Sequence, residues 1–194
     1  HLRLFIAVSV PEAVKDEIAR AAEELRRVLP GSAMRWTRRE ELHLTLRFLG
    51  EVQASHLENL TQALRTTGAG FPPLQMGAAG IGGVPEDRPA RVVWVGVRDQ
   101  AGHLEALQRA IQNATAPFTA QPPEERFTGH VTLGRVKHLQ RAEAAALSRL
   151  AAGMAERHFG EWLAPEIELF RSQLSEQGAL HMRLAAVPLV QKSP

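Results

Sequence analysis

One pattern, a histidine, an apolar residue, a threonine and a leucine, occurs twice in this chain of 194 residues. The first copy opens HLTLRFLG at residues 43–50, and the second opens HVTLGRVK at residues 130–137. Alternation of polar and apolar residues is typical of a strand with one buried face. His43 and Thr45 then share one face of the first strand, and His130 and Thr132 share one face of the second. The fold must therefore hold two strands whose polar faces carry the same pair of side chains.

The segments around the two motifs follow the same order of strand, helix, motif strand, helix and further strand. Strands are expected at 2–8, 42–49, about 74–81, 91–97, 127–136, 165–173 and 179–187. This order predicts one domain, residues 1–194, with two lobes that correspond to approximate repeats at 2–82 and 91–187 and are related by a pseudo-twofold axis. The hairpin expected around Gly178 favours antiparallel sheets, so the fold class is α+β.

Helices are expected where apolar residues recur at helical spacing. Ser9 and Glu12 have the spacing of a capping box before one such stripe, and so do Ser55 and Glu58 before another. Two further helices are expected, one around Leu104, Leu107 and Ile111 and the other at 140–152.

Composition excludes several classes of function. The chain has no cysteine, which rules out disulfides and thiolate metal sites, and it has no apolar run of about 18 residues that could span a membrane. Its start does not read as a signal peptide, so a cytoplasmic location is expected. The net charge is only +2, so total charge does not predict nonspecific nucleic-acid binding. Neither a phosphate-binding loop nor a zinc-binding motif is present.

Two histidines and two threonines facing one cleft suit phosphodiester chemistry. Histidine titrates near neutral pH, so a neutral ring can accept a proton from a nucleophile while a protonated ring gives one to the leaving oxygen. Threonine hydroxyls can donate hydrogen bonds to the non-bridging phosphate oxygens. The residues alone leave open which histidine is the acid, because the two motifs are nearly symmetric.

HLTLRFLG and HVTLGRV resemble the paired motifs of the two-histidine (2H) phosphoesterases. RLFIAVSVPE, MRWTRREELHLTLRFLGEV, RPARVVWVGV and FTGHVTLGRVK are similar to segments of the bacterial and archaeal RNA 2′,3′-cyclic phosphodiesterases, also called 2′-5′ RNA ligases. The resemblance implies a bilobal fold of two mainly antiparallel sheets with flanking helices and a central cleft. It implies no cofactor and no metal, with His43 as proton donor, His130 as proton acceptor, and Thr45 and Thr132 beside them.

Four further residues are expected to bind substrate. Arg135 would reach the phosphate if a bulge near Gly134 returned it to the face of His130. Arg47 shares its parity with His43, and Arg126 shares its parity with His130, so both are expected to contact RNA. Phe48 has the opposite parity and needs a bend in the strand to serve as a base-stacking platform.

Two features of the flanking sequence bear on these sites. The family often has proline before the second histidine, whereas this chain has Gly129, which is expected to add backbone freedom. Arg35, Arg38 and Arg39 precede the first motif and indicate either a funnel for phosphate or a solvated charged surface.

The function predicted is metal-independent opening of an RNA 2′,3′-cyclic phosphate to a 2′-phosphate, with 2′-5′ ligation as a side activity. The expected partner is a tRNA-like or short RNA carrying that end, and the protein is expected to be a monomer without membrane contact. The alternatives are a noncatalytic module that binds RNA ends, or a 2H phosphodiesterase acting on 2′-5′ oligoadenylates or small cyclic nucleotides.

Overall fold

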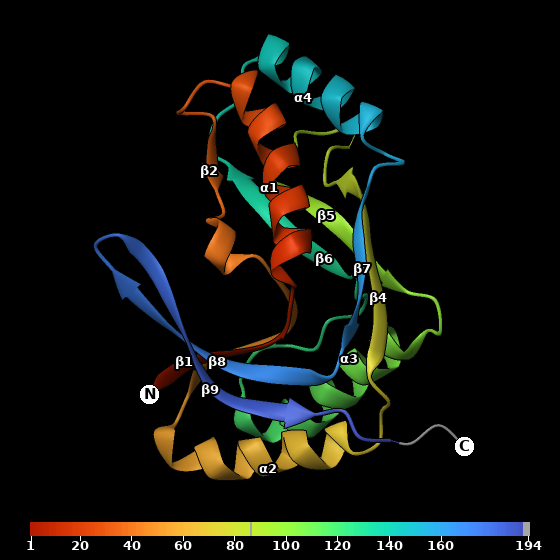
Figure 1. Cartoon of the computed structure of the whole chain (residues 1–194). Helices are drawn as coiled ribbons and strands as arrows, with labels where there is room; N and C mark the ends of the chain where they lie inside the picture. The colour runs from red at the N-terminus through yellow and green to blue at the C-terminus, as the bar shows by residue number, and fades with distance from the viewer. Residues whose placement is uncertain (86, 192–194) are drawn as a thin grey trace.

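A computed structural model describes residues 1–85 and 87–191, which form two antiparallel sheets flanked by helices (Figure 1). The first sheet has the strand order β3-β1-β8-β9 and contains β1 (Leu2–Ser9), β3 (His43–Val52), β8 (Glu166–Ser175) and β9 (Gly178–Pro188). The second has the order β2-β6-β5-β4-β7 and contains β2 (Met34–Trp36), β4 (Leu74–Gly82), β5 (Val92–Asp99), β6 (His130–Val136) and β7 (His158–Ala164). We call them sheet A and sheet B. The predicted α+β class is confirmed.

The helices lie on the outer sides of the two sheets. Helices α2 (Leu57–Gly68) and α3 (His103–Thr115) pack on sheet A, whereas α1 (Glu12–Arg27) and α4 (Arg141–Gly153) pack on sheet B (Figure 1). Three short 3₁₀ helices, η1 (Arg39–Glu41), η2 (Ala54–His56) and η3 (Ala116–Phe118), lie in the connections. Each sheet thus has one face that these helices do not cover.

Each sheet takes strands from both halves of the chain. Strands β1 and β3 come from the first half and pair with β8 and β9 from the second, while β2 and β4 join β5, β6 and β7. The two sheets therefore do not follow the boundaries of the sequence repeats at 2–82 and 91–187. Because each sheet needs strands from both halves of the chain, neither half can form a complete sheet alone.

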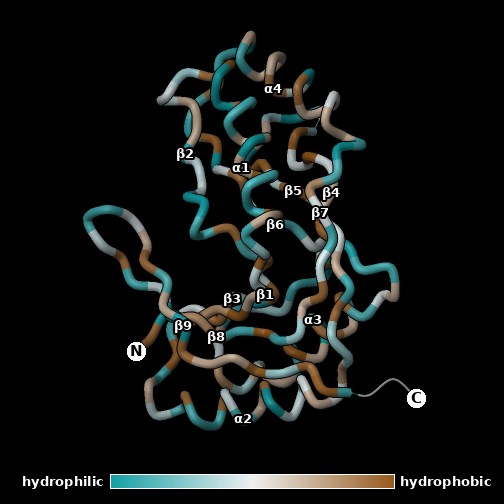
Figure 2. The backbone as a smooth tube through the Cα atoms, viewed as in Figure 1, coloured by the Kyte–Doolittle hydropathy of each residue, from teal (hydrophilic) through white to brown (hydrophobic). Residues whose placement is uncertain are grey.

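One hydrophobic core runs through both layers. Residues of β1, such as Leu4 and Ile6, and residues of β6, such as Val131 and Leu133, are all nearly inaccessible and belong to the same cluster. Hydrophobic residues follow the strands and one side of each helix (Figure 2). This shared core fixes the two motif strands relative to each other, and β3 contacts β6 where the sheets meet.

Local structure differs from the sequence prediction at two helix starts and two strands. The Ser9 hydroxyl donates to Glu168 of β8 instead of capping α1, whose N-cap is Pro11, and Ser55 lies within η2, so neither predicted capping box forms. A capping box does form at α4, where the backbone N–H of Gln140 donates to Glu143 at 2.8 Å. The short strands β2 and β7 were not expected.

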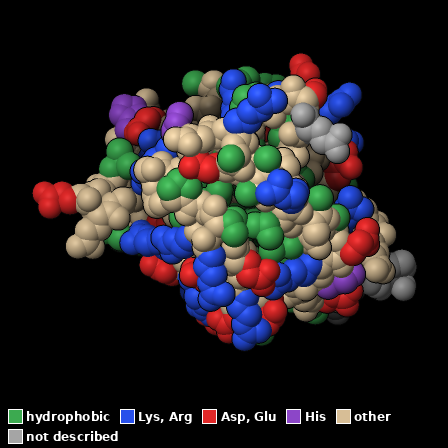
Figure 3. Space-filling view, turned by 90° about the horizontal axis from the view of Figure 1, so that it is seen from above, with side chains coloured by type: hydrophobic (Ala, Val, Ile, Leu, Met, Phe, Trp, Pro, Cys, Tyr) green, Lys and Arg blue, Asp and Glu red, His purple; other side chains and the backbone are tan. Residues whose placement is uncertain are grey.

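Charged side chains of both signs are interspersed at the end of the molecule formed by α1 and α4 (Figure 3). On α1, Glu12, Glu17 and Glu23 form ion pairs with Lys15, Arg20 and Arg27, one helical turn away. Each pair contains one acidic and one basic side chain and adds nothing to the net charge, which is small. Among the described residues, no helix is both long enough and apolar enough to cross a membrane.

Candidate active site

The two motifs occupy matching places in their sheets. His43 pairs with Ser9 of β1, and His130 pairs with Gly96 of β5, each at the first position of its motif strand. Thr45 pairs with Ala7 two residues further on, and Thr132 pairs with Trp94. Because directly paired residues of antiparallel strands point to the same side, each sheet has one face that carries a histidine and a threonine. We call this the histidine face; it is the face that the helices leave uncovered.

A bulge follows each motif at the same position. Leu46 has no partner between the pairs Thr45–Ala7 and Arg47–Ile6, and Leu133 has none between Thr132–Trp94 and Gly134–Val93. Each bulge inserts one residue and so exchanges the faces of the residues that follow it. The two motif strands therefore share a backbone bulge as well as the sequence pattern of histidine, apolar residue, threonine and leucine (HxTL).

The bulge at Leu133 places Arg135 on the histidine face of sheet B. Arg135 pairs with Val92, which has the same parity on β5 as Trp94 and Gly96, the partners of Thr132 and His130. The side chain is exposed. On a regular strand Arg135 would lie on the opposite face, and only a bulge near Gly134 would bring it to this one. The bulge at Leu133 has this effect.

The bulge at Leu46 exchanges the expected positions of Arg47 and Phe48. Arg47 pairs with the core residue Ile6 and is only 3% exposed, whereas Phe48 pairs with Phe5 on the histidine face and is 54% exposed. Phe48 thus corresponds in sheet A to Arg135 in sheet B, since each lies five residues after its histidine. The bend required for Phe48 to reach the substrate face is present.

Arg47 has a structural contact instead of the expected RNA contact. Its Nη1 donates to the Pro122 carbonyl at 2.8 Å, and its Nη2 donates to the Gln121 carbonyl at 2.9 Å. Nearby, the Thr119 hydroxyl donates to the Leu49 carbonyl at 2.5 Å. The prediction that Arg47 binds substrate is therefore corrected, because its guanidinium fastens the segment before β6 to β3.

His43 lies among aromatic rings. Its ring stacks on Phe5 with centroids 5.1 Å apart, and Phe170 lies parallel at 6.2 Å. His181 of β9 approaches edge-on at 5.5 Å. Burial lowers the pKa of His43 to about 4, with a further decrease from the charge of His181, while Glu41 opposes both. Burial also lowers the pKa of His181, although Glu41 again acts in the opposite direction.

We expect the His43 ring to stay neutral down to low pH in the unliganded protein. The pKa in the folded protein, about 4, lies below the ordinary value of 6.5. The folded protein therefore binds fewer protons than the unfolded chain between these values, and the free energy of unfolding falls as pH falls through this range. An NMR titration of histidine ring nitrogens checks this, with the signals missing in His43→Gln assigned to His43. A His43 midpoint near pH 6.5 would show that burial does not control this ring.

The hydrogen bond of His130 fixes its tautomer. Ring Nδ1 lies 2.7 Å from the Thr128 carbonyl, which can only accept, so Nδ1 carries the proton in the neutral ring. The lone pair of a neutral His130 is then on Nε2. Trp94 lies beside the ring, with centroids 5.6 Å apart. This arrangement suits a proton acceptor, because the acceptor nitrogen is the one not held by the backbone.

Gly129 is held tightly at the entry to β6. Its carbonyl accepts from the Val97 backbone N–H at 2.9 Å, and a Cβ at this position would lie 2.5 Å from the Val97 carbonyl oxygen. The expectation that Gly129 adds backbone freedom is thus corrected, because the close approach of β5 restrains it. The same approach explains why this chain has glycine there.

The remaining predicted site residues differ in their surroundings. Thr45 and Thr132 are half-buried, and no hydrogen bond of either hydroxyl is found within residues 1–85 and 87–191. Arg126 is exposed in the segment before β6, outside any strand, so its predicted parity with His130 does not apply. His181 was not singled out from the sequence, because only the β8–β9 pairing brings it beside His43.

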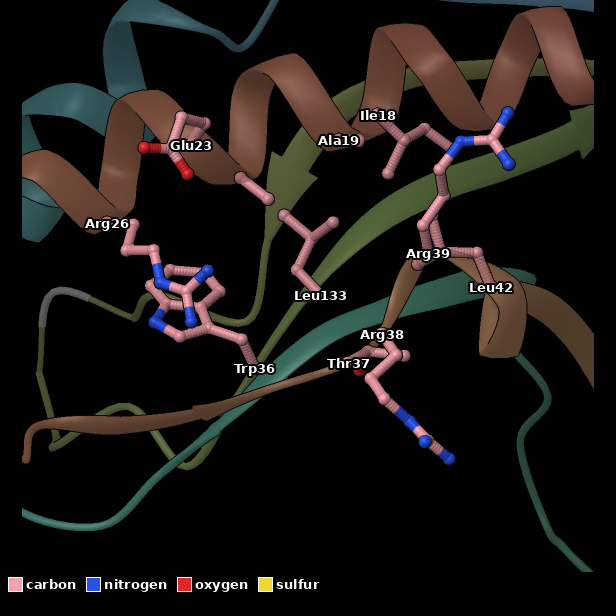
Figure 4. Close-up of a pocket in the computed structure, with 11 residues that line it drawn as sticks. Ile18, Ala19, Glu23, Arg26, Trp36, Thr37, Arg38, Arg39, Leu42 and Leu133 are labelled. Carbon is pink, nitrogen blue, oxygen red and sulfur yellow. The ribbon is translucent and has the colours of Figure 1, made fainter. Parts of the chain in front are cut away.

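Two surface cavities lie beside the sheets. A cavity of about 250 Å³ lies between α1 and β2, lined by Ile18, Trp36 and Leu133, with Arg38 directed away from it (Figure 4). Trp36 pairs with Gly134, whose neighbour Arg135 is on the histidine face, so this cavity is on the opposite face of sheet B. The second, of about 230 Å³, lies beside Ser9, Glu168 and Arg183.

Comparison with known families agrees with the doubled geometry. The family model described as LigT like phosphoesterase matches the chain twice, over residues 8–94 and over residues 95–181. The chain belongs to the LigT-like phosphoesterase family. Each match includes one of the two motifs. The family suggested by the two HxTL segments is therefore confirmed.

Several curated relatives align with this LigT-like phosphoesterase over nearly its whole length. A protein of Archaeoglobus fulgidus is 30% identical over 183 residues, covering 94% of this chain and 98% of the relative. One of Methanothermobacter thermautotrophicus is 28% identical over 180 residues, covering 93% and 95%. Both relatives are named RNA 2′,3′-cyclic phosphodiesterase.

Solved structures show the same fold. TT0787 of Thermus thermophilus superposes with a TM-score of 0.74 at 23% identity, covering 97% of this chain and 98% of the other. Escherichia coli LigT in complex with 3′-AMP superposes with a TM-score of 0.73 at 22% identity, covering 98% and 99%. The arrangement of two antiparallel sheets in this LigT-like phosphoesterase is thus a known one.

Proposed function

We propose that this LigT-like phosphoesterase opens the 2′,3′-cyclic phosphate at the end of an RNA and leaves a 2′-phosphate. The observation that carries the proposal is the matched register of the two motif strands, which gives each sheet a histidine and a threonine on its uncovered face. The names of its relatives support the same reaction. The matched geometry supports turnover rather than binding alone, because binding a phosphate does not need two proton-transfer groups.

The proposed mechanism is a single displacement at phosphorus. His130 Nε2 accepts a proton from water, the water oxygen bonds to phosphorus, and the bond between phosphorus and the 3′-oxygen breaks. His43 gives its proton to that 3′-oxygen. Thr45 and Thr132 donate hydrogen bonds to the non-bridging oxygens, where negative charge must be stabilised. No step in this scheme requires a metal ion.

The proton-donor role of His43 requires a change in its pKa. Burial holds this pKa at about 4 in the unliganded protein, so the ring is neutral near pH 7. A phosphate anion bound against the ring favours the imidazolium and raises the pKa. In this proposal, His43 gains its proton together with the substrate. The hydroxyls of Thr45 and Thr132, together with Arg135, hold the anion in place. The terminal base stacks on the ring of Phe48.

Product analysis tests the proposal. The purified protein is incubated with a short RNA ending in a 2′,3′-cyclic phosphate, in buffer with EDTA, and the product is separated from synthetic 2′- and 3′-phosphate standards. The expected product is the 2′-phosphate, formed at the same rate with and without EDTA. Exclusive formation of the 3′-phosphate would overturn the regiochemistry, and activity only after metal addition would overturn the metal-free mechanism.

The same experiment separates the alternatives. If a 5′-hydroxyl attacks phosphorus in place of water, the bond to the 3′-oxygen breaks and a 2′-5′ phosphodiester forms, so adding an RNA with a 5′-hydroxyl to the RNA with the cyclic end tests 2′-5′ ligation. Tight binding of the cyclic end without conversion would indicate a noncatalytic module. Faster turnover of 2′-5′ oligoadenylates or of small cyclic nucleotides would indicate another 2H activity.

A further inference from the structure

Two arginines are directly opposite each other on the histidine face of sheet B. Arg35 of β2 pairs with Arg135 of β6 in antiparallel register, and both side chains are exposed. Directly paired residues point to the same side, so Arg35 shares the face of His130 and Thr132. Like charges in this position destabilise a sheet. The pair is therefore not explained by the stability of the fold.

Neither arginine of this pair has a counter-charge within residues 1–85 and 87–191. The two other arginines near β2 do, since Arg38 bonds Glu41 at 2.8 Å and Arg39 bonds Asp16 at 2.7 Å. No ion pair of Arg35 or Arg135 occurs there, and Glu176 in the turn between β8 and β9 forms none with them. Within the part of the chain that the structure describes, Arg35 is thus the one arginine of the three before the first motif that has no acidic partner, so it can meet an anion from solution.

The β8–β9 turn bounds the space beside Arg35. A Cβ built on Gly178 would lie 3.7 Å from Nη2 of Arg35, so the turn and this guanidinium are close neighbours. The turn is held in place by Arg38, whose Nη2 donates to the Ala179 carbonyl at 2.8 Å. The β8–β9 hairpin extends away from sheet A on this side of the molecule (Figure 1). An anion at Arg35 would thus lie between a fixed turn and Arg135.

The positions along β6 indicate where this anion belongs on a substrate. Successive residues on one face of a strand are about 6.6 Å apart, and neighbouring strands are about 4.8 Å apart. From His130, the face passes Thr132 and then Arg135, and Arg35 lies one strand further out. Arg135 thus lies further along β6 than Thr132, and Arg35 lies level with Arg135 on the neighbouring strand. Two guanidinium groups side by side, both away from His130, can meet two successive phosphates of one RNA end.

We infer that Arg35 binds the phosphodiester on the 5′ side of the terminal nucleotide, while Arg135 binds the cyclic phosphate. The inference rests on the proposed function and names its substrate class: an RNA end of at least two nucleotides, in preference to a mononucleoside cyclic phosphate. Arginine suits this contact because its guanidinium can donate two parallel hydrogen bonds to a phosphate.

The test compares two substrates that differ by one phosphodiester. The kcat/KM is measured for a dinucleotide with a 2′,3′-cyclic end and for the matching mononucleoside 2′,3′-cyclic phosphate. Arg35→Gln should lower the value for the dinucleotide about tenfold and change the mononucleoside value less than twofold. Arg65→Gln, at an exposed arginine of α2 on the far side of sheet A, should change neither. Equal effects of Arg35→Gln on both substrates, or no effect on either, would overturn the inference.

Binding of the products keeps this test separate from the proposed function. Wild-type protein should bind the dinucleotide with a 2′-phosphate more tightly than the mononucleoside 2′-phosphate, and Arg35→Gln should abolish most of the difference. The affinity for the dinucleotide should also depend less on salt concentration in Arg35→Gln than in the wild type, because one charge–charge contact is lost. If Arg35→Gln shows the same difference between the two products as the wild type, the role of Arg35 is overturned, even if no turnover occurs. If the wild type binds the dinucleotide product more tightly and Arg35→Gln does not, but no turnover occurs, only the proposed function is contradicted.

Discussion

Replacement of His43 or of His130 by alanine is expected to lower kcat for opening a 2′,3′-cyclic phosphate by about 10² to 10⁴, because each removes one proton transfer. Both side chains are half-buried at the first position of a motif strand, and the Cα positions that hold them are fixed by pairing with Ser9 and Gly96. The double variant should be little slower than either single variant, since groups that act as a unit have non-additive effects. Rates are measured with enough enzyme to detect slow single turnover.

A matched control distinguishes loss of chemistry from loss of fold. His138 is exposed two residues after the end of β6, so His138→Ala should keep full activity. Circular dichroism and thermal unfolding should show that the His43 and His130 variants fold. Full activity in either folded variant would remove that histidine from the mechanism.

Replacement of Thr45 or Thr132 by alanine is expected to lower kcat by about 10² to 10³, the cost of losing one donor to a developing charge. Both threonines lie beside the histidines, and their hydroxyls have no hydrogen bond within the described residues. A group already bonded inside the protein would have less to offer the transition state. KM should change much less than kcat, because the charge to be stabilised develops only during the reaction.

Two comparison variants make the threonine result specific. Thr→Ser at either site keeps the hydroxyl and should recover most of the lost rate, whereas Thr→Val keeps the shape without it and should not. Thr66→Ala on α2 removes a hydroxyl that bonds the Gln62 carbonyl at 3.1 Å, and it should leave kcat unchanged. An active Thr→Val variant would show that shape, not hydrogen bonding, accounts for the threonine.

Most elements of the fold could be predicted because their residue pattern is local. The period of two at 43–50 and 130–137, and the helical stripes, correspond to observed strands and helices. The three-residue strand β2 is too short to show a period, and β7 is interrupted by Gly160, whose φ is 137°. The mixing of both halves in each sheet depends on pairing between distant strands, which no local pattern encodes.

The positions of the candidate site residues in the sheets were only partly predictable from the sequence. Parity assigns faces correctly until a strand contains an extra residue, and both motif strands contain one directly after the threonine. The bulge at Leu46 therefore turned Arg47 into the core and Phe48 out of it. For Arg135 the neighbouring Gly134 indicated that a bulge could change the face, whereas no residue type marks the bulge at Leu46. The contact between His43 and His181 depends on the β8–β9 hairpin and has no signal in the motif.

The pH dependence of residual activity tests the shared acid–base site most directly. Wild-type kcat/KM should follow a bell-shaped curve whose two limbs belong to the pair of histidines as coupled groups. In His130→Ala only the proton donor remains, so residual kcat/KM should fall as pH rises. In His43→Ala only the acceptor remains, so it should fall as pH falls. Slopes of the same sign in both variants would contradict the paired mechanism, and exchanged slopes would reverse the two roles.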